Sequence, residues 1–483
     1  MKKNVALTIM AFFAVILTHA QEEVLSFKIE ESNYLIKNKD AYSLPNSMNG
    51  DLALVLVEKK TVYAKLFDKN FQFIKAFETD ALKSKYNNFL DYKVIGNKYY
   101  LLASNNSYKK FAVLSIDFDK QQGESIEVDF QFDNEKFLET VRYNNQPYII
   151  SATTENAFIL RTLNNDLKPE ILHTVEIGDP EKDQKLLARK SHMFFAPIES
   201  NITKIDNRVP VTIEQAASKT KLYQNENKIY LTFDDDEQSN TSLFILDLKT
   251  LELSTHFFKY PEGRVKEFAR YNSFILDNNI IQLGSNKEEM KIEVKNFDGE
   301  IIKEYYLEKE VPIAIKNSPI IQEGGTAIPF VNRREMEETS KFLRKVSSGK
   351  LGITIYETPS GYTATIGGYK IVANNGGGMM MMGGGGFTSV GNTGVGGMPI
   401  MVFNPTFYSY NMHEATKSTF FNTHFDKDFN YVKKEVEVDV FDKIEEYKKD
   451  IDRITAEDVF FHNNNLYFGY FNMRDKYYRI IKM

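Results

Sequence analysis

The sequence contains no cysteine and no tryptophan among its 483 residues. Without cysteine there can be no disulfide, no thiolate nucleophile, and no zinc or iron–sulfur site with cysteine ligands. The fold must therefore be stabilised by a hydrophobic core, and a chain of this length is long enough to form one.

Long basic runs are also missing. The chain has 60 Lys and Arg residues against 66 Asp and Glu residues, a formal net charge of -6. Nucleic-acid-binding surfaces are built from clustered basic side chains, so this balance argues against nucleic acid as a partner.

The N-terminus carries one short apolar run. Lys2 and Lys3 precede the run Val5–Leu17, and the small-residue site Thr18-His19-Ala20 follows it. This pattern predicts a signal peptide over residues 1–20, because the run is too short to span a bilayer comfortably. An uncleaved anchor is the alternative. Cleavage would remove two lysines and no acids, which changes the net charge from -6 to -8.

No later segment of the sequence is apolar enough to cross a membrane as a helix, so no transmembrane span is expected after cleavage. We therefore expect an exported, soluble protein located in a periplasm or outside the cell, with association with an outer membrane as a further option.

Abundant aromatic residues (27 Tyr and 37 Phe) accompany short segments of alternating apolar and polar residues. The clearest example, residues 271–307, predicts four antiparallel strands joined by Asn-, Asp- and Gly-containing turns, since those residues tolerate positive φ. The predicted strands are Tyr271–Leu276, Ile280–Ser285, Met290–Asn296 and Ile301–Leu307.

Similar units recur on both sides of this one. The turn that precedes the last strand of each unit gives the spacing of the repeat. The spacing is 51 residues from Asp68 to Asp119, 46 residues from Asp119 to Asn165, and 51 residues from Asp247 to Asp298. The final unit has three strands (Asp458–Phe461, Leu466–Phe471 and Tyr477–Lys482), whereas an isolated strand, Val24–Glu30, lies near the N-terminus. Pairing the isolated strand with the final unit would close a ring and cover exposed strand edges.

This repeat pattern resembles β-propeller proteins, whose repeats run about 40–50 residues. The expected fold is an all-β propeller of about seven four-stranded blades (six to eight), closed by the N-terminal strand. Two stacked sheets or an irregular β-array are the alternatives. No Trp-Asp, kelch or Asp-box signature recurs, so no functional residues are implied by the resemblance. We expect residues 21–483 to form one domain, with insertions at about 178–219, 308–350 and 368–416.

The insertions at about 308–350 and 368–416 lie before and within one unit, residues 351–438. A short helix is predicted over Arg334–Lys345. The following unit begins with Leu351–Tyr356 and Tyr362–Gly367 and is then interrupted. Ser418–Phe425 and Phe429–Val438 are predicted to complete it.

Candidate site residues are few. Asp234, Asp235, Asp236 and Glu237 form the densest acidic run and are weak candidates for a cation site. A solvated hairpin turn is the preferred interpretation, because consecutive side chains on a strand point to opposite faces. His424 and His462 lie near strand ends, where propeller sites form, but an ordinary turn or surface role is favoured for each. No catalytic residue, metal site or cofactor is predicted.

The segment Gly376–Gly397 is rich in glycine and contains four consecutive methionines. Two interpretations are equally favoured: a mobile insertion with no role, and an adaptable apolar contact for a protein or membrane surface. Cu(I) ligation by thioethers is the less favoured alternative. The candidate partner-binding residues are Met379, Met380, Met381, Met382 and Phe387.

These observations favour an exported, non-enzymatic propeller that acts as a protein-interaction or ligand-binding scaffold. The alternatives are a glycan-active propeller hydrolase or lyase with a central-channel site, and an accessory subunit of an outer-membrane or secretion assembly. Several titratable groups with shifted pKa values that converge in a channel pocket would favour the enzyme.

Overall fold

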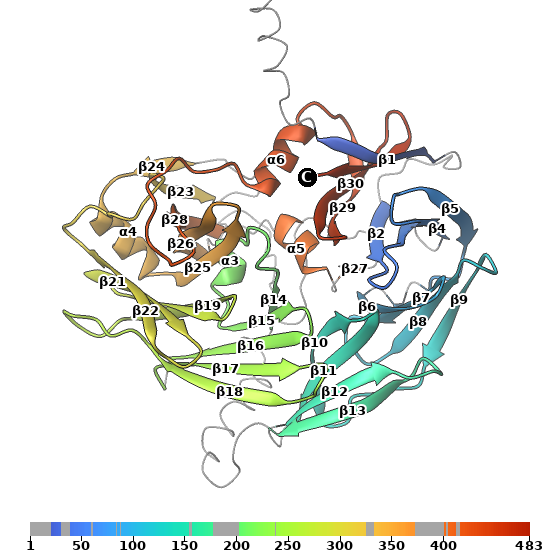
Figure 1. Cartoon of the computed structure of the whole chain (residues 1–483), viewed down its shortest axis with the longest axis horizontal. Coiled ribbons are helices and arrows are strands. Elements are labelled where there is room, and N and C mark those ends of the chain that lie inside the picture. Colours follow the sequence, from blue (N-terminus) through green and yellow to red (C-terminus); the bar gives the residue numbers. More distant parts are fainter. Residues whose placement is uncertain are drawn as a thin grey trace, which may run out of the picture.

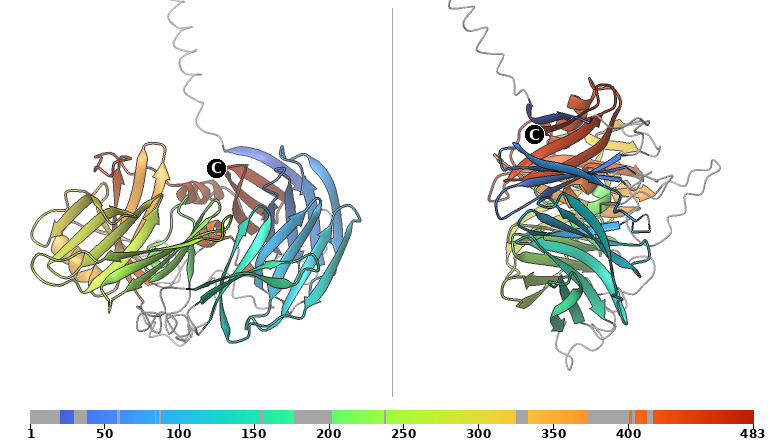
Figure 2. Two further views of the ribbon diagram at one scale, coloured as in Figure 1. Left: turned by 60° about the horizontal axis from the view of Figure 1, so that its bottom comes forward. Right: turned by 90° about the vertical axis from the view of Figure 1, so that its right-hand side faces the viewer.

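The computed structural model of the chain is a ring of seven mainly antiparallel sheets around a common centre, a seven-bladed β-propeller (Figure 1). The side view in Figure 2 shows that the blades form a disc. The structure describes residues 21–29, 39–58, 61–83, 85–86, 88–153, 157–176, 202–236, 238–324, 333–371, 400–401, 404–411 and 416–483.

Blades 1 to 3 are consecutive in sequence, and each runs from an inner to an outer strand. Blade 1 contains β2 (Lys39–Pro45), β3 (Leu52–Glu58), β4 (Thr61–Phe67) and β5 (Phe73–Thr79). Blade 2 contains β6 (Asn88–Ile95), β7 (Lys98–Ser104), β8 (Phe111–Asp117) and β9 (Gln122–Val128). Blade 3 contains β10 (Glu135–Tyr143), β11 (Gln146–Thr153), β12 (Ala157–Leu163) and β13 (Pro169–Glu176).

Blades 4 and 5 follow the same order. Blade 4 contains β15 (Thr220–Asn225), β16 (Lys228–Asp235), β17 (Asn240–Asp247) and β18 (Leu253–Lys259). A short strand, β14 (Thr203–Ile205), pairs in parallel with β15. Blade 5 contains β19 (Arg270–Leu276), β20 (Asn279–Ser285), β21 (Glu289–Asn296) and β22 (Ile301–Glu308), which confirms the four strands predicted for this unit.

The ring is closed by the N-terminal strand, as predicted. Blade 7 contains β29 (Ile454–His462), β30 (Asn465–Asn472) and β31 (Tyr477–Lys482), and β1 (Glu22–Lys28) pairs with β31 as its outer strand. Phe27 of β1 packs on Phe67 of blade 1 and Tyr478 of blade 7, with ring centroids 5.9 and 5.8 Å away. The first strand of the chain therefore holds the last blade to the first.

Blade 6 is assembled in a different order from the predicted one. Its strands are β25 (Lys350–Thr358), β26 (Gly361–Ile371), β28 (Thr416–Phe425) and β23 (Ile320–Gly324), with β24 (Arg334–Met336) at the edge. The prediction of an outer strand at Phe429–Val438 was wrong. Only Tyr431 bridges to Phe425 there, and β23, from the preceding insertion, pairs with β28 instead.

Helices are short and more numerous than the single one expected. The predicted helix at Arg334–Lys345 is divided between strand β24 and helix α4 (Thr339–Val346). The further helices in the described part of the chain are α3 (Ile213–Ala216), α5 (Pro405–Asn411) and α6 (Val440–Lys448). The sequence analysis did not identify β2, which is the inner strand of blade 1.

The same turn joins the third strand to the next segment in blades 1 to 6. In each, an Asp or Asn side-chain oxygen accepts a hydrogen bond from the backbone N–H two residues later, over 2.8–3.1 Å. A residue with positive φ follows three or four positions after the Asp or Asn. The residues that accept these bonds are Asp68, Asp117, Asn164, Asp247, Asn296 and Asp426.

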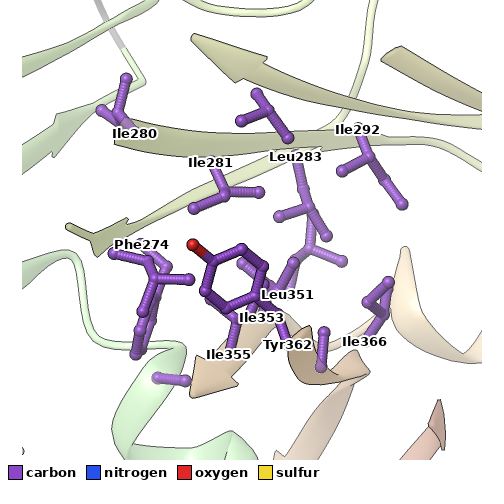
Figure 3. Packing of buried hydrophobic residues seen from close by; sticks show 14 of the residues in the cluster. Phe274, Ile280, Ile281, Leu283, Ile292, Leu351, Ile353, Ile355, Tyr362 and Ile366 are labelled. Atoms are coloured by element: carbon purple, nitrogen blue, oxygen red, sulfur yellow. The ribbon is translucent and has the colours of Figure 1, made fainter. Parts of the chain in front are cut away.

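Apolar side chains fill the spaces between neighbouring blades. Figure 3 shows the contact of blades 5 and 6, where Ile281 and Leu283 of β20 face Ile353 and Ile355 of β25. Burial of this kind stabilises the fold by about 25 cal/mol per Å² of apolar surface. Because blades bury both faces against their neighbours, strands such as β3 and β6 are buried along almost their whole length, whereas the outer strands β5, β9 and β13 are exposed or half-buried along most of theirs.

Polar bonds join neighbouring blades across three of the blade boundaries. Asp458 of blade 7 accepts a bond from the Ser43 N–H of blade 1 over 2.8 Å. Arg142 of blade 3 contacts Asp91 of blade 2 over 2.6 Å, and Asp234 of blade 4 accepts from the Ser273 N–H of blade 5 over 3.0 Å. These bonds hold blade 7 against blade 1, blade 2 against blade 3, and blade 4 against blade 5.

Three of the inner strands share a local irregularity. A β-bulge immediately precedes Asp91 in β6, Glu139 in β10 and Asp458 in β29. A bulge re-aims the side chains that follow it. All three carboxyl groups are buried, so this repeated bulge places an acid in the wall of the ring at three blades.

Candidate binding groove

An open groove lies where the inner strands of blades 4, 5 and 6 end. Its volume is about 420 Å³, within the range of small-molecule sites. The residues that line it are Asn207, Arg208, Tyr223, Gln224, Asn225, Tyr230, Ile275, Leu276, Asp277, Glu357, Thr358 and Pro359.

Three strand ends form its wall: the end of β15, the turn from β19 to β20, and the turn from β25 to β26. Asp277 occupies the second of these turns with φ +52°, a conformation that Asp and Asn adopt more easily than most residues. One Asp277 oxygen accepts a hydrogen bond from the Tyr362 hydroxyl of blade 6 over 3.0 Å. This bond fixes the carboxylate between two blades.

The segment after β14 supplies the remaining wall. The Arg208 guanidinium donates two hydrogen bonds to Asp206, over 2.8 and 2.9 Å, and its carbon lies 3.8 Å from the centre of the Phe461 ring of blade 7. The Thr406 hydroxyl of α5 donates to the same Asp206 over 2.5 Å. Arg208 is thus fixed by Asp206 of its own segment and by Phe461 of blade 7, yet its side chain remains 57% exposed.

Charges in the groove are largely compensated. Burial alone would raise the pKa of Asp206, but the charge and hydrogen bonds of Arg208 outweigh it and hold that pKa below its usual value. Glu357 forms an ion pair with Lys427. Asp277 is the one charged residue of the lining for which no ion pair is found among the described residues.

Several polar atoms of the lining have no partner within the described part of the chain. The acceptors are one oxygen of Asp277 and the side-chain oxygens of Asn207 and Gln224, whose nitrogens donate to the carbonyls of Ile275 and Arg142. The donors are Nη1 of Arg208 and the amide of Asn225. The groove therefore offers both donors and acceptors to a ligand.

The two acids with pKa values raised to about 7 do not line this groove. Burial raises the pKa of Glu139, partly opposed by the charge of Lys204. Burial likewise raises the pKa of Asp458, opposed by its hydrogen bonds with Ser43. Both groups lie in the buried wall of the ring.

The acidic run at residues 234–237 is only partly a turn. Asp234 and Asp235 end strand β16, and the interpretation of Asp234 as solvated was wrong, because it is 1% exposed. Asp234 contacts the fully buried Lys221 over 3.2 Å and accepts from Thr241 over 2.7 Å. Asp236 pairs with Lys219, and Glu237 lies outside the described residues. Within the described ranges no group of three His, Asp or Glu side chains could hold a metal ion.

Neither of the singled-out histidines lies at the surface. His424 is 1% exposed, and its Nδ1 is 2.8 Å from the Thr363 hydroxyl. His462 is 2% exposed and packs against the rings of Phe71 and Tyr467. Burial lowers the pKa of both residues, so each favours the neutral form.

The Gly/Met candidates, Met379 to Met382 and Phe387, lie outside the described residues, as does the predicted signal peptide. The strand that follows the Gly/Met segment, β27 (Ile400–Met401), belongs to a different blade from the strand that precedes it. It pairs in parallel with β6 of blade 2. Among the helices that the structure describes, none is long and apolar enough to cross a membrane.

Sequence reasoning missed the groove residues. Asn207 and Arg208 lie in an insertion, and nothing in their spacing indicates that they meet the strand ends of blades 4 to 6. The one available signal was the position of Asn225, Asp277 and Pro359 in or beside the first turn of three successive units, since the loops at the ends of inner strands share one face of a propeller.

Comparisons with known proteins place the chain in no family. No family model and no curated protein sequence matches it. Among solved structures, it resembles the Dos1 propeller with 10% identity, 96% of this chain and 95% of that chain covered, and a TM-score of 0.33. It also resembles the apocarotenoid oxygenase of Synechocystis, with 7% identity, 56% of this chain covered and a TM-score of 0.28. The chain spans about three fifths (61%) of that enzyme's length, and since both scores are low, the propeller assignment rests on strand topology.

Proposed function

We propose that the protein is an exported β-propeller that acts as a non-enzymatic scaffold and binds a ligand or a protein segment in the groove of blades 4 to 6. The observation that carries this proposal is the set of unpartnered donors and acceptors that the segment after β14 and the strand ends of blades 4 and 5 bring together around Arg208 and Asp277. Preorganised polar groups in a concavity are typical of ligand sites.

The position of the shifted titratable groups favours binding over catalysis. General acid–base chemistry needs groups with suitable pKa values within reach of the substrate. Glu139 and Asp458 have such values but are engaged in the buried wall rather than in the groove. Export is supported by the signal-like residues 1–20, and a mature chain that begins at Gln21 by mass spectrometry would test it.

Binding is tested by affinity capture from membrane and soluble fractions of the source cell. The bait is the mature wild-type protein or the double variant Asn225→Ala, Asp277→Asn, which alters the groove without touching the core. Loss of the captured molecules from the double variant supports the proposal. Full retention of every captured molecule by the double variant would contradict it.

A further inference from the structure

The groove also restricts what kind of molecule it can bind. An anion needs an uncompensated cation, but the Arg208 guanidinium is already paired with Asp206. An anionic ligand would also lie close to Asp277 and Glu357, which are carboxylates. Like charges at short range disfavour binding, so anionic ligands fit this groove poorly.

A purely cationic ligand is also a poor match. A protonated amine has donors only and would satisfy Asp277. It would leave the donors of Arg208 and Asn225 without acceptors, and a desolvated donor without a partner weakens binding. A wholly apolar ligand would leave all of these groups unpartnered.

A hydroxyl group is both a donor and an acceptor, so a molecule with several neighbouring hydroxyls matches the mixed set of partners in the groove. The acceptors come from Asp277, Asn207 and Gln224, and the donors from Arg208 and Asn225. Tyr223 and Tyr230 also line the groove but are buried, so the polar groups at the strand ends are the ones that a ligand can reach.

Building on the proposed function, we propose that the groove binds a neutral carbohydrate through these five side chains. Because the groove is open and lies at the ends of the inner strands, it would bind the end or a short stretch of an oligosaccharide. Asp277, with no ion pair among the described residues, is the strongest acceptor of the set, because hydrogen bonds to a charged acceptor exceed those to the neutral amide oxygens of Asn207 and Gln224.

The absence of tryptophan provides a direct reporter. Pro359 is exposed at the groove rim, so Pro359→Trp introduces a single tryptophan beside the ligand. Its fluorescence is titrated with maltohexaose, cellohexaose, xylohexaose and chitohexaose, with hexagalacturonate as the anionic probe and spermidine as the cationic probe. Melting curves first establish that the reporter variant is folded.

We expect saturable signals with at least one neutral oligosaccharide and none with hexagalacturonate or spermidine. Asp277→Asn in the reporter background should weaken that binding about tenfold. Asparagine tolerates the positive φ at position 277, and its side-chain oxygen can still accept the hydrogen bond from the Tyr362 hydroxyl. The matched control is Asp298→Asn, an exposed acid in the outer turn of the same blade, which should change nothing.

Two results would overturn the carbohydrate assignment. A response to hexagalacturonate or spermidine alone would assign the groove to a charged ligand and leave the proposed scaffold function intact. No fluorescence response to any of the six probes would also contradict the carbohydrate assignment. The affinity capture would then test the scaffold function independently. Recovery of bound oligosaccharides unchanged after long incubation distinguishes binding from hydrolysis.

Discussion

At the scale of single residues, the ring depends on charged groups buried where blades meet. Lys221 and Asp234 are fully buried, and the pair also engages Thr241 and the Ser273 N–H. Burial lowers the pKa of Lys221 and the charge of Asp234 opposes the shift. A buried charge that loses its partner is costly, so these positions should be far less tolerant than surface charges.

We expect Lys221→Met to lower the free energy of unfolding by about 3–5 kcal/mol, because Asp234 would remain buried without its cation. Urea denaturation measures the change. The control is Lys219→Met, which removes a partly exposed pair with Asp236 and should cost less than about 1 kcal/mol. Equal effects of the two substitutions would contradict the assignment of Lys221 as the structural cation.

Glu139 should make the stability depend on pH. Its pKa is about 7 in the folded state, above the usual value of a glutamate. The folded protein therefore binds more protons than the unfolded chain between these values. Its contribution to stability is fully present below the unfolded pKa and is lost as the pH rises through about 7.

Glu139→Gln keeps an acceptor for the Thr140 N–H and removes the titration. We expect urea midpoints measured from pH 5 to pH 8 to fall less steeply with rising pH than those of the wild type. Glu170→Gln, on the exposed outer strand of the same blade, serves as the control. An unchanged slope in Glu139→Gln would show that other groups set the dependence.

At the scale of elements, each blade is a simple meander, but two blades need strands from elsewhere. Blade 7 takes β1 from the N-terminus, and blade 6 takes β23 from an insertion. An unpaired strand edge is a template for aggregation, so these borrowed strands protect the fold as well as complete it.

Deletion of residues 22–31 should lower the melting temperature and promote aggregation, because the edge of β31 and the Phe27 contacts with Phe67 and Tyr478 would be lost. Calorimetry and light scattering measure both effects. Phe27→Ala, which keeps the strand, should give a smaller decrease. A deletion variant that stays monodisperse with wild-type melting would argue against ring closure by β1.

At the scale of the whole molecule, the insertions connect distant parts of the ring. The chain leaves blade 6 after Ile371 and pairs with blade 2 at β27. Asn404, which immediately precedes α5, then donates to Asp458 of blade 7 over 3.3 Å. The cluster of α5, α6 and blade 7 includes Tyr410, Ile444 and Phe468. The ring thus depends on segments that the repeat does not contain.

The Gly/Met segment is expected to contribute little to stability, since fixing a glycine-rich backbone costs about 1–2 kcal/mol per residue. A Gly-Ser replacement of residues 374–397 should retain the original length, because the flanking strands lie on blades 6 and 2. We expect an unchanged melting temperature, and loss of any partner that the methionines contact. Changing Met379 to Met382 together to Ser should reproduce the loss. Unfolding of the replacement variant, or retention of every partner, would reject this role.

The sequence alone determined the class of fold, the period and the closure of the ring. Alternating segments and Asx turns act over a few residues, so Asp68, Asn296 and Asp426 mark the repeat wherever they occur. Blade 5 was predicted strand by strand for that reason. The wrong prediction of a strand at Phe429–Val438 has a physical cause. This segment alternates like a strand, but β23, which is far away in the sequence, occupies the edge of β28 with which it would have paired.

The groove was decided by tertiary structure alone. Its residues come from an insertion and from turns of three blades, and each is an ordinary polar residue in its own segment. Asp234 illustrates the same limit, since an acidic run looks solvated until Lys221 and the next blade enclose it. Local patterns encode strands and turns because those are local interactions, whereas burial, pairing partners and the meeting of side chains depend on contacts that form only when the ring closes.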